Sequence, residues 1–291
     1  MKAFEFDFII LGGDNRQIYL QELLVQQGYR VESIGLSDRE ENADSYQKLI
    51  TQSACVVGAI PFLKNGRALY LPDKDISLSL NELQTMLQAG QKLAAGCIPF
   101  AMKEFCNNNK IAYFDFMDDA PLTLYNTIAT AEGAIVEAIQ KSPLNLCNQK
   151  SLVLGFGKCA QTLANRLTGL QSYVTVAARK EDARMLSETM GYQSIYFEQL
   201  GFHINQYDFI FNTVPDLVLD AELLKNVSKQ AIIIDIASVP GGVDYSFAKK
   251  NNIPAFLCLG LPGKYAPKAS AEKIAERLIL FFSDSFDILR R

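Results

Sequence analysis

Short apolar runs alternate with longer amphipathic segments along most of this 291-residue chain. Phe6–Leu11 is an apolar run of strand length, whereas Gln17–Gln27 repeats apolar residues at roughly helical spacing. Strands that alternate with helices are typical of a parallel sheet covered by helices on both faces. Because the alternation occurs in two consecutive series, we expect an α/β protein with two doubly wound parallel-sheet domains.

The first series predicts one domain over residues 1–127, which we interpret as the substrate domain. Its further strands are expected at Arg30–Ile34, Ala54–Val57, Lys92–Ala95 and Ile111–Phe116, and its further helices at Asn81–Gln88 and Pro99–Asn107. The segment from Ile60 to Asp75 contains prolines and a glycine, and we expect it to be a long loop that borders a cleft.

A linking helix, Thr127–Lys141, is expected to end before Ser142-Pro143, because the residue that precedes a proline is disfavoured in the α region. The second series follows over residues 128–268. Its strands are expected at Ser151–Leu154, Tyr173–Ala178, Phe209–Asn212, Ile232–Asp235 and Ala255–Cys258. Its helices are expected at Ala160–Leu167, Asp182–Met190, Ala221–Asn226 and Tyr245–Lys250, and a final helix, Ala271–Phe282, follows the series.

Composition narrows the class of protein. Apolar residues make up 49% of the chain and charged residues 21%, which excludes a disordered chain. A net charge of −4 makes nucleic acid an unexpected partner. His203 is the single histidine, and no two of the six cysteines form a C-x-x-C pair, so we expect no metal site and buried, reduced thiols. No apolar stretch approaches about 18 residues, so we expect no membrane partner and a cytoplasmic location.

The strongest motif is a glycine-rich turn between a predicted strand and a predicted helix. The strand ending at Leu154 is followed by Gly155-Phe156-Gly157-Lys158-Cys159-Ala160, which has the spacing G-x-G-x-x-A. The first glycine permits the turn, the second lets a pyrophosphate approach the backbone, and the alanine lets the helix pack closely. The helix N-terminus offers free N–H groups to the anion. We therefore predict a Rossmann dinucleotide site that includes Phe156 and Lys158.

The end of the next strand distinguishes the two nicotinamide cofactors. An NAD site usually has an acidic residue there to hold the ribose 2′-hydroxyl, whereas this chain has Arg179-Lys180. A guanidinium and an ammonium suit a 2′-phosphate, so we predict NADP; two solvated loop cations are the alternative. Further cofactor contacts are expected where later strands end, at Asn212, Thr213, Val214, Pro215, Ile236, Ala237 and Ser238.

A carboxylate-binding group is expected near the start of the chain. Arg16 follows Gly12-Gly13 and is placed at a helix N-terminus, which suits a substrate carboxylate; an ion pair with Asp14 is the alternative. Lys264, followed by Lys268, is expected to approach the substrate from the second domain. Candidate bases for proton transfer are Asp14, Glu132 and Lys268, and the sequence does not choose between them. For Glu132, capping of the linking helix is the alternative.

Five motifs, in order along the chain, resemble the dipicolinate synthase A subunits of spore-forming bacteria. They are Gly12–Gln17, Thr130–Ile135, Val153–Gly157, Asp235–Gly242 and Gly260–Lys268. The resemblance implies NADP-linked oxidation of a dihydrodipicolinate-type precursor to dipicolinate (pyridine-2,6-dicarboxylate), a small dicarboxylate. It also implies a partner, the flavoprotein-like B subunit, and a role during sporulation in the cytoplasm of the mother cell.

The fold that this resemblance implies is the two-domain arrangement of formate and glycerate dehydrogenases. The first domain is then flavodoxin-like, the second is the Rossmann domain, and the final helix, 269–291, packs back onto the first. We further expect a homo-oligomer. Two other functions remain open: an NAD(P)-dependent dehydrogenase or reductase of another small carboxylic acid or cyclic imine, and a non-catalytic nucleotide-binding scaffold for its partner.

Overall fold

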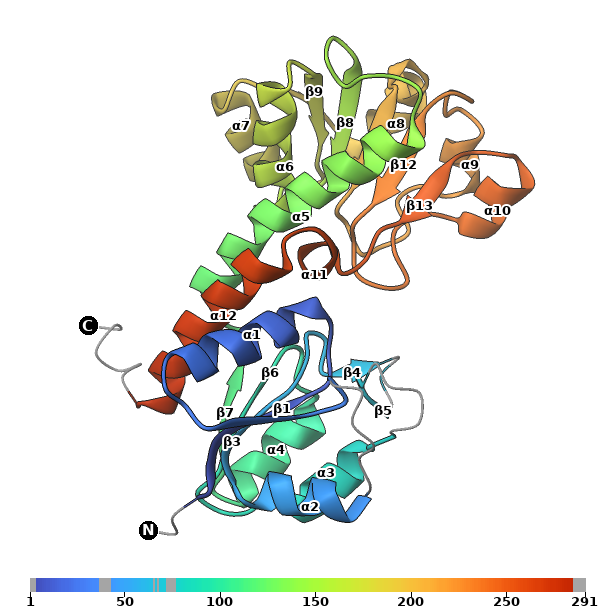
Figure 1. Ribbon diagram of the computed structural model, residues 1–291. Coiled ribbons are helices and arrows are strands. Elements are labelled where there is room, and N and C mark those ends of the chain that lie inside the picture. Colours follow the sequence, from blue (N-terminus) through green and yellow to red (C-terminus); the bar gives the residue numbers. More distant parts are fainter. Residues whose placement is uncertain (1–3, 37–42, 65, 67, 72–76, 285–291) are drawn as a thin grey trace. The chain divides into compact units, whose positions relative to one another are not determined.

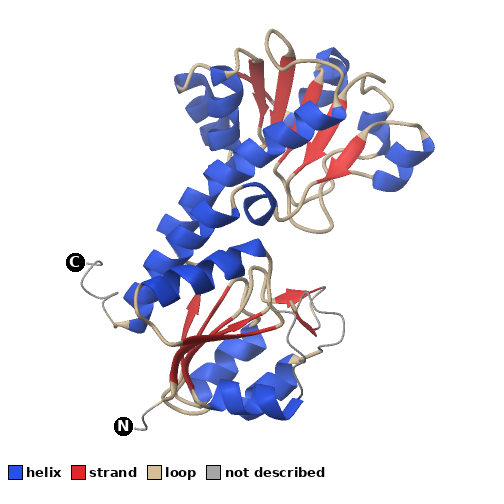
Figure 2. Ribbon diagram, viewed as in Figure 1, coloured by secondary structure: helices blue, strands red, loops and turns tan. Residues whose placement is uncertain are grey.

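The computed structural model describes residues 4–36, 43–64, 66, 68–71 and 77–284 (Figure 1). The chain divides into two compact units. The first combines Met1–Tyr125 with Ala266–Arg291, and the second is Asn126–Tyr265. The expected boundaries, 127/128 and 268/269, lie within a few residues of these divisions. Each unit is a parallel sheet with helices on both faces (Figure 2), which confirms the predicted α/β class.

The first unit contains a five-stranded parallel sheet with the order β2-β1-β3-β6-β7. Its strands are β1 (Phe6–Leu11), β2 (Val31–Ile34), β3 (Ser53–Val57), β6 (Lys92–Ala95) and β7 (Ala112–Asp115). Its helices are α1 (Asn15–Gln26), α2 (Ala43–Thr51), α3 (Leu80–Met86), α4 (Phe100–Asn108) and α12 (Pro267–Phe282). A short antiparallel hairpin, β4 (Leu63–Lys64) and β5 (Ala68–Leu69), lies in the segment that the sequence predicted to be a loop; residues 65, 67 and 72–75 of that segment lie outside the described residues.

Alternation along β1 explains how this sheet is covered. Phe8 and Ile10 are fully buried in one apolar cluster with residues of α1 and α12, whereas Ile9 and Leu11 are buried in another with residues of α2, α3 and α4. A strand that is apolar on both faces must be covered on both, as strands of parallel sheets are. The C-terminal helix therefore contributes to the core of the first unit; residues 285–291, which the sequence analysis included in it, lie outside the described residues.

The second unit contains a six-stranded parallel sheet with the order β10-β9-β8-β11-β12-β13. Its strands are β8 (Lys150–Leu154), β9 (Tyr173–Ala177), β10 (Gln193–Ile195), β11 (Phe209–Asn212), β12 (Ile232–Asp235) and β13 (Ala255–Leu257). Its helices are α6 (Lys158–Gly169), α7 (Glu181–Thr189), α8 (Leu200–His203), α9 (Ala221–Leu224), α10 (Tyr245–Lys250) and α11 (Leu261–Tyr265), with short 3₁₀ turns η1 (Phe197–Gln199) and η2 (Ile204–Gln206). This strand order is that of the Rossmann fold, whose dinucleotide crevice lies where the order reverses, between β8 and β11.

The linking helix begins earlier than its apolar pattern predicted. Helix α5 spans Ala120–Lys141 and not Thr127–Lys141. Asp119 accepts a hydrogen bond from the backbone N–H of Leu122 and so caps the helix. Pro121 is tolerated because the first turn of a helix needs no N–H donor. The pattern also missed α2, which has nine residues, and the shorter β10, α8 and α11.

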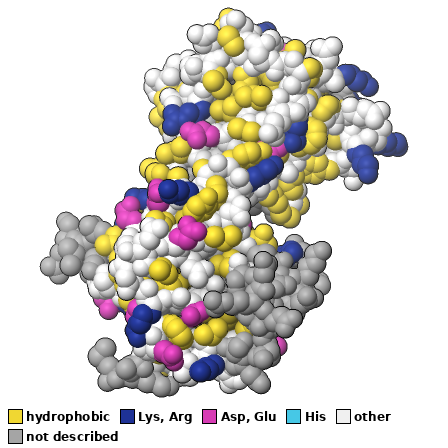
Figure 3. Space-filling view, viewed as in Figure 1, with side chains coloured by type: hydrophobic (Ala, Val, Ile, Leu, Met, Phe, Trp, Pro, Cys, Tyr) yellow, Lys and Arg dark blue, Asp and Glu magenta, His cyan; other side chains and the backbone are white. Residues whose placement is uncertain are grey.

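A membrane span would be seen in the helices, and a large basic patch on the surface, of which Figure 3 draws one face. Within the described residues, no helix is both long and apolar enough to cross a bilayer. On the face drawn in Figure 3, Lys and Arg side chains are scattered among acidic and apolar ones.

Candidate cofactor site

The glycine turn after β8 is built as the motif predicted. Gly155 has φ +89°, a left-handed conformation, and a Cβ there would lie 2.7 Å from Oγ1 of Thr213. Its N–H donates to the carbonyl of Ala177 at the end of β9. Ala160 is fully buried in the core shared by β8 and α6. The fold itself therefore requires a glycine at 155 and a small side chain at 160.

Gly157 differs from Gly155 because nothing in the fold occupies its missing side chain. It has φ −76°, an ordinary value, and no described heavy atom lies within 4 Å of the position of a Cβ. It is the N-cap of α6, and no described side chain caps that helix there. The space beside a helix N-terminus with unused N–H groups is what a pyrophosphate requires.

A cavity of about 550 Å³ lies beside this turn, within the second unit. Its lining contains six of the predicted cofactor residues: Gly155, Phe156, Gly157, Arg179, Lys180 and Val214. Five further residues line it that the motifs did not indicate: Ala178, Asp182, Ala183, Leu186 and Phe197. Helix periodicity places Asp182, Ala183 and Leu186 on one face of α7, so a helical projection could have found them, whereas Phe197 carries no sequence signal.

The two cations at the end of β9 have different surroundings. Arg179 is 55% exposed, and its Nη2 lies 3.2 Å from Oδ2 of Asp216 in the loop after β11. The guanidinium carbon also lies 5.5 Å from the centre of the Phe197 ring. Lys180 is the exposed N-cap residue of α7. Arg179 is thus oriented by two partners that come from distant parts of the sequence.

A buried polar network shapes the loops after β11 and β12. The fully buried amide of Asn212 donates to Asp235 (2.8 Å) and to the carbonyl of Val214 (3.0 Å). Asp235 also accepts hydrogen bonds from Gly242 N–H and from the Tyr245 hydroxyl, both at 2.7 Å. Burial and the bond to Asp235 raise the pKa of Tyr245. The Asn212 side chain, expected beside the cofactor, thus holds the loop backbone.

The remaining predicted contacts lie outside the lining of the cavity. Thr213 donates from its hydroxyl to the carbonyl of Leu154 at 2.8 Å, and Ala237 N–H donates to Asp235 at 3.0 Å. Lys158, Pro215 and Ser238 are exposed, and Ile236 is half-buried. These residues lie at the carboxyl ends of their strands or, for Lys158, at the start of α6, as the sequence analysis placed them.

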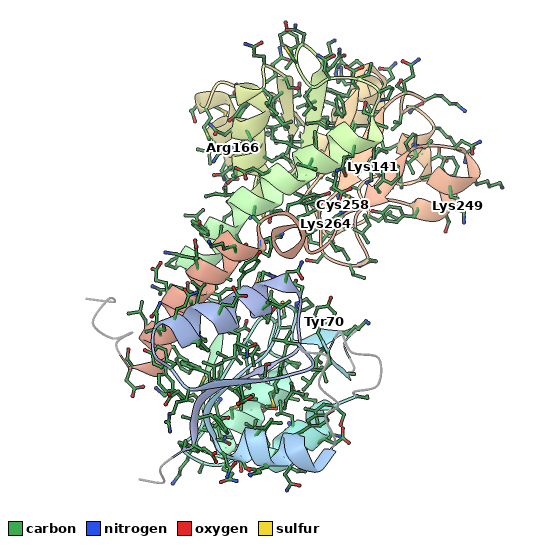
Figure 4. The ribbon with its side chains drawn as sticks, in the orientation of Figure 1. Tyr70, Lys141, Arg166, Lys249, Cys258 and Lys264 are labelled. Carbon is green, nitrogen blue, oxygen red and sulfur yellow. The ribbon has the colours of Figure 1, made fainter. Side chains whose placement is uncertain are left out.

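Lys264, expected to bind substrate, lies in an ion-pair cluster within the second unit. The buried Glu137 carboxylate accepts hydrogen bonds from Lys264 (2.6 Å), from the Tyr265 hydroxyl (2.7 Å) and from Lys141. Burial alone would raise the pKa of Glu137, but these donors lower it to about 2. Burial, with the nearby Glu137 charge, raises the pKa of Cys258 to about 11; Figure 4 shows Lys141, Cys258 and Lys264 in the same region. The cluster ties α11 to α5.

Arg16, expected to bind a carboxylate, is paired with Asp14. The Arg16 side chain is 4% exposed and donates to both oxygens of the Asp14 carboxylate at 2.7 and 2.8 Å. It also donates to the carbonyl of Ile60 at 2.7 Å, and Asp14 caps α1. The alternative given for Arg16, an ion pair with Asp14, is therefore what the structure contains.

The other two candidate bases are exposed. Lys268 lies in the first turn of α12 and belongs to the first unit, whereas the sequence analysis placed it in the second domain. Glu132 lies in the middle of α5, 3.8 Å from Nε of Arg166, so capping of that helix is excluded. Among the described residues, no group of three or more His, Cys, Asp or Glu side chains could hold a metal ion.

A second cavity of about 550 Å³ lies where β8, β9 and β10 begin, at the opposite edge of the same sheet. Tyr192 is hydrogen-bonded to Thr168, and Tyr207 to Thr175 and Gln206; burial raises the pKa of both phenols. Some of the lining polar side chains bond to one another, as Lys150 does to Gln206 at 3.2 Å, and none of the predicted cofactor residues lines this cavity. The cavity beside the glycine turn is the better candidate.

Two family models match the chain, one within each of its two compact units. Residues 7–117 match the family model for the N-terminal domain of the dipicolinate synthase A subunit. Residues 137–257 match the model described as shikimate / quinate 5-dehydrogenase. The first match covers the sheet of the first unit except Phe6, and the second covers all six strands of the Rossmann sheet.

Whole-chain comparisons extend the likeness across both units. The chain is 26% identical to the dipicolinate synthase A subunit of Bacillus subtilis over 283 residues, which are 92% of this chain and 93% of that protein. The crystal structure of the dipicolinate synthase A subunit from Bacillus halodurans superposes with a TM-score of 0.83 at 23% identity, covering 97% of this chain and 99% of that one.

The fold is also that of dehydrogenases. D-lactate dehydrogenase from Escherichia coli superposes with a TM-score of 0.62 at 12% identity, covering 96% of this chain and 97% of that one. In a Rossmann fold, the crevice for a dinucleotide lies at the turn after the first strand, which here is the glycine turn after β8. The resemblance read from the sequence motifs is thus confirmed: over nearly its whole length, the chain is similar to the A subunit of dipicolinate synthase.

Proposed function

We propose that this chain is the NADP-dependent subunit of a dipicolinate synthase. It would oxidise a dihydrodipicolinate-type precursor to pyridine-2,6-dicarboxylate. The observation that supports the cofactor is the open space at Gly157, beside an uncapped helix N-terminus and a cavity lined by Arg179 and Lys180. The substrate rests on the similarity to the dipicolinate synthase A subunit.

The residues present fit a phosphorylated dinucleotide. The N-terminus of α6 would hold the pyrophosphate, with Gly157 leaving room for it, and Arg179 and Lys180 would hold the 2′-phosphate. Asn212 would act indirectly, by keeping the loop 213–215 in place. When bound, NADP⁺ supplies the acceptor for one hydride from the ring; a ring proton leaves to a base, so the products are dipicolinate, NADPH and H⁺.

The contacts in the structure reduce the number of residues that we propose for binding a substrate carboxylate or for transferring a proton. Asp14 and Arg16 neutralise each other, and we assign them to shaping the loop after β1. Lys264 is paired with Glu137, so we assign it to fixing α11. Lys268 and Glu132 keep exposed side chains and stay the candidates for proton transfer. We further propose a partner, the flavoprotein-like B subunit, together with a homo-oligomeric state and a role in the cytoplasm of the mother cell during sporulation.

The cofactor assignment is tested by titrating the purified chain with NADPH and NADH, following the fluorescence of the reduced nicotinamide; the chain contains no tryptophan to obscure it. We expect NADPH to bind more tightly. Arg179→Ala removes a charge-assisted contact of about 1.5–3 kcal/mol but also an exposed ion pair of about 0.2–1 kcal/mol. The net loss is about 0.5–2.8 kcal/mol, a roughly two- to hundredfold weaker NADPH complex, with NADH unchanged. Equal binding of both nucleotides by the unaltered chain would contradict the assignment.

The reaction itself is tested by supplying the chain with NADP⁺ and cyclic diacid precursors, and by recording the absorbance of a newly formed pyridine ring. Formation of NADPH and of the ring in equal amounts supports the proposal. Turnover of a different carboxylic acid or cyclic imine, without the dihydrodipicolinate-type precursor, would favour another dehydrogenase. Nucleotide binding with no turnover, even when a B subunit is supplied, would favour a scaffold.

A further inference from the structure

The cation that would hold the 2′-phosphate is already paired with an acidic side chain. Arg179 Nη2 lies 3.2 Å from Oδ2 of Asp216, and both side chains are more than half exposed. The pair joins the loop after β9 to the loop after β11. These two strands flank β8 in the sheet, so the pair lies between the two loops on either side of the glycine turn.

A second arginine, Arg184, holds the backbone that carries Arg179. The buried Arg184 donates from Nη1 to the carbonyls of Ala178 (3.3 Å) and Arg179 (3.4 Å). Its guanidinium stacks on Tyr196, with 3.3 Å between the guanidinium carbon and the ring centre. Because its backbone is held in this way, Arg179 can change partners only by rotating its side chain.

The backbone that carries Asp216 is fixed as well. It packs against Gly242, where a Cβ would lie 2.8 Å from the carbonyl oxygen of Asp216 and 2.7 Å from that of Val214. Gly242 is anchored in turn, because its N–H donates to the buried Asp235 and its carbonyl accepts from Val218 N–H. The Asp216 carboxylate is thus presented to Arg179 by a loop that the buried network keeps in place.

We infer that Asp216 is a specificity-determining residue of the dinucleotide site, one that competes with a 2′-phosphate for Arg179. A phosphate monoester carries more charge and more acceptor oxygens than a carboxylate, so it takes over the guanidinium. That exchange breaks the Arg179–Asp216 ion pair, and the loss of the pair weakens the net binding of the phosphorylated dinucleotide. A dinucleotide with a 2′-hydroxyl leaves the pair intact. Asp216 therefore lowers the preference for NADPH over NADH. This inference rests on the proposed NADP site.

The test is Asp216→Asn, titrated with NADPH and with NADH. The change keeps the size of the side chain and removes its charge. We expect the Kd for NADPH to fall about two- to fivefold, the range of an exposed ion pair, and the Kd for NADH to stay unchanged. Glu222→Gln is the matched control, because it removes the same charge from the next helix, α9, where Glu222 pairs with Lys225. It should change neither value.

A second variant links the effect to Arg179. In an Arg179→Gln background, Asp216→Asn should no longer tighten the binding of NADPH. Without the guanidinium, Asp216 and the 2′-phosphate have no shared partner to compete for. An unchanged or weaker NADPH complex in Asp216→Asn would overturn the inference, as would an equal gain for NADH or a gain that persists without Arg179. If the unaltered chain binds neither nucleotide, the proposed function itself fails, which is a different result.

Discussion

Replacing Gly157 by alanine separates what the fold needs from what a ligand needs. The glycine has φ −76°, and no described heavy atom lies within 4 Å of the position of the added Cβ. Alanine is a poorer N-cap than glycine by several tenths of a kcal/mol, but it also stiffens the unfolded chain, which stabilises by about 0.4–1 kcal/mol. These terms offset each other, so the free energy of unfolding should change by less than about 0.5 kcal/mol.

The same methyl group should nevertheless weaken dinucleotide binding. It would occupy the space through which a pyrophosphate reaches the N–H groups at the start of α6. Charge-assisted hydrogen bonds of this kind contribute about 1.5–3 kcal/mol, so NADPH should bind about ten- to hundredfold more weakly. The measurements are urea unfolding followed by circular dichroism, and titration of NADPH fluorescence.

Gly155→Ala is the matched control, because this variant should lose stability whereas Gly157→Ala should not. Its φ of +89° and the 2.7 Å approach to Oγ1 of Thr213 predict strain in the empty protein, about 1–3 kcal/mol of lost stability. A Gly157→Ala variant that is stable and binds NADPH as tightly as the unaltered chain would refute the assignment of the glycine turn. A Gly157→Ala variant as unstable as Gly155→Ala would show that the space beside Gly157 is not free.

Two further predictions concern stability. The pKa of Glu137 falls from 4.5 to about 2 on folding, so its hydrogen bonds stabilise the protein fully above pH 4.5 and less as the pH falls toward 2. In Glu137→Gln, the free energy of unfolding should not show this loss when the pH is lowered. An acid profile equal to that of the unaltered chain would contradict the stabilising role of the Glu137 carboxylate. Asp119 and Arg277 form a nearly buried ion pair with both Oδ2 contacts within 3.2 Å. Asp119→Asn keeps a helix cap but breaks the pair, so urea unfolding should show a loss of about 3 kcal/mol, and NADPH affinity, a property of the second unit, should be retained.

The sequence predicted best those strands whose side chains are buried on both faces of the sheet. The strands Phe209–Asn212 and Ile232–Asp235 were predicted at their observed bounds, because each is a run of three apolar residues followed by one polar residue, all of them buried. The start of α5 was not predicted, because it depends on Asp119, whose cap carries no apolar periodicity. The short edge strand β10 has only half-buried or exposed side chains and so lacks an apolar run.

The candidate site divides in the same way. Gly155 and Ala160 could be assigned from the motif, because each has one local backbone or packing reason, whereas the reason proposed for Gly157 is the ligand that would fill the space beside it. Arg16 could not be assigned, because the choice between a substrate carboxylate and Asp14 depends on burial. Its 4% exposure and its bond to the carbonyl of Ile60, 44 residues away, exist only in the folded chain.

Arg179 shows why counting cations at the end of β9 gives only part of the cofactor preference. The count indicates a site for a 2′-phosphate, but the strength of that site depends on what the guanidinium already contacts. Asp216 is 37 residues away in the chain and reaches Arg179 because β9 and β11 both flank β8 and their loops end at the same edge. In the proposed site, the local residues would therefore select the type of ligand, while Asp216, brought near by the sheet order, would set how strongly one nucleotide is preferred over the other.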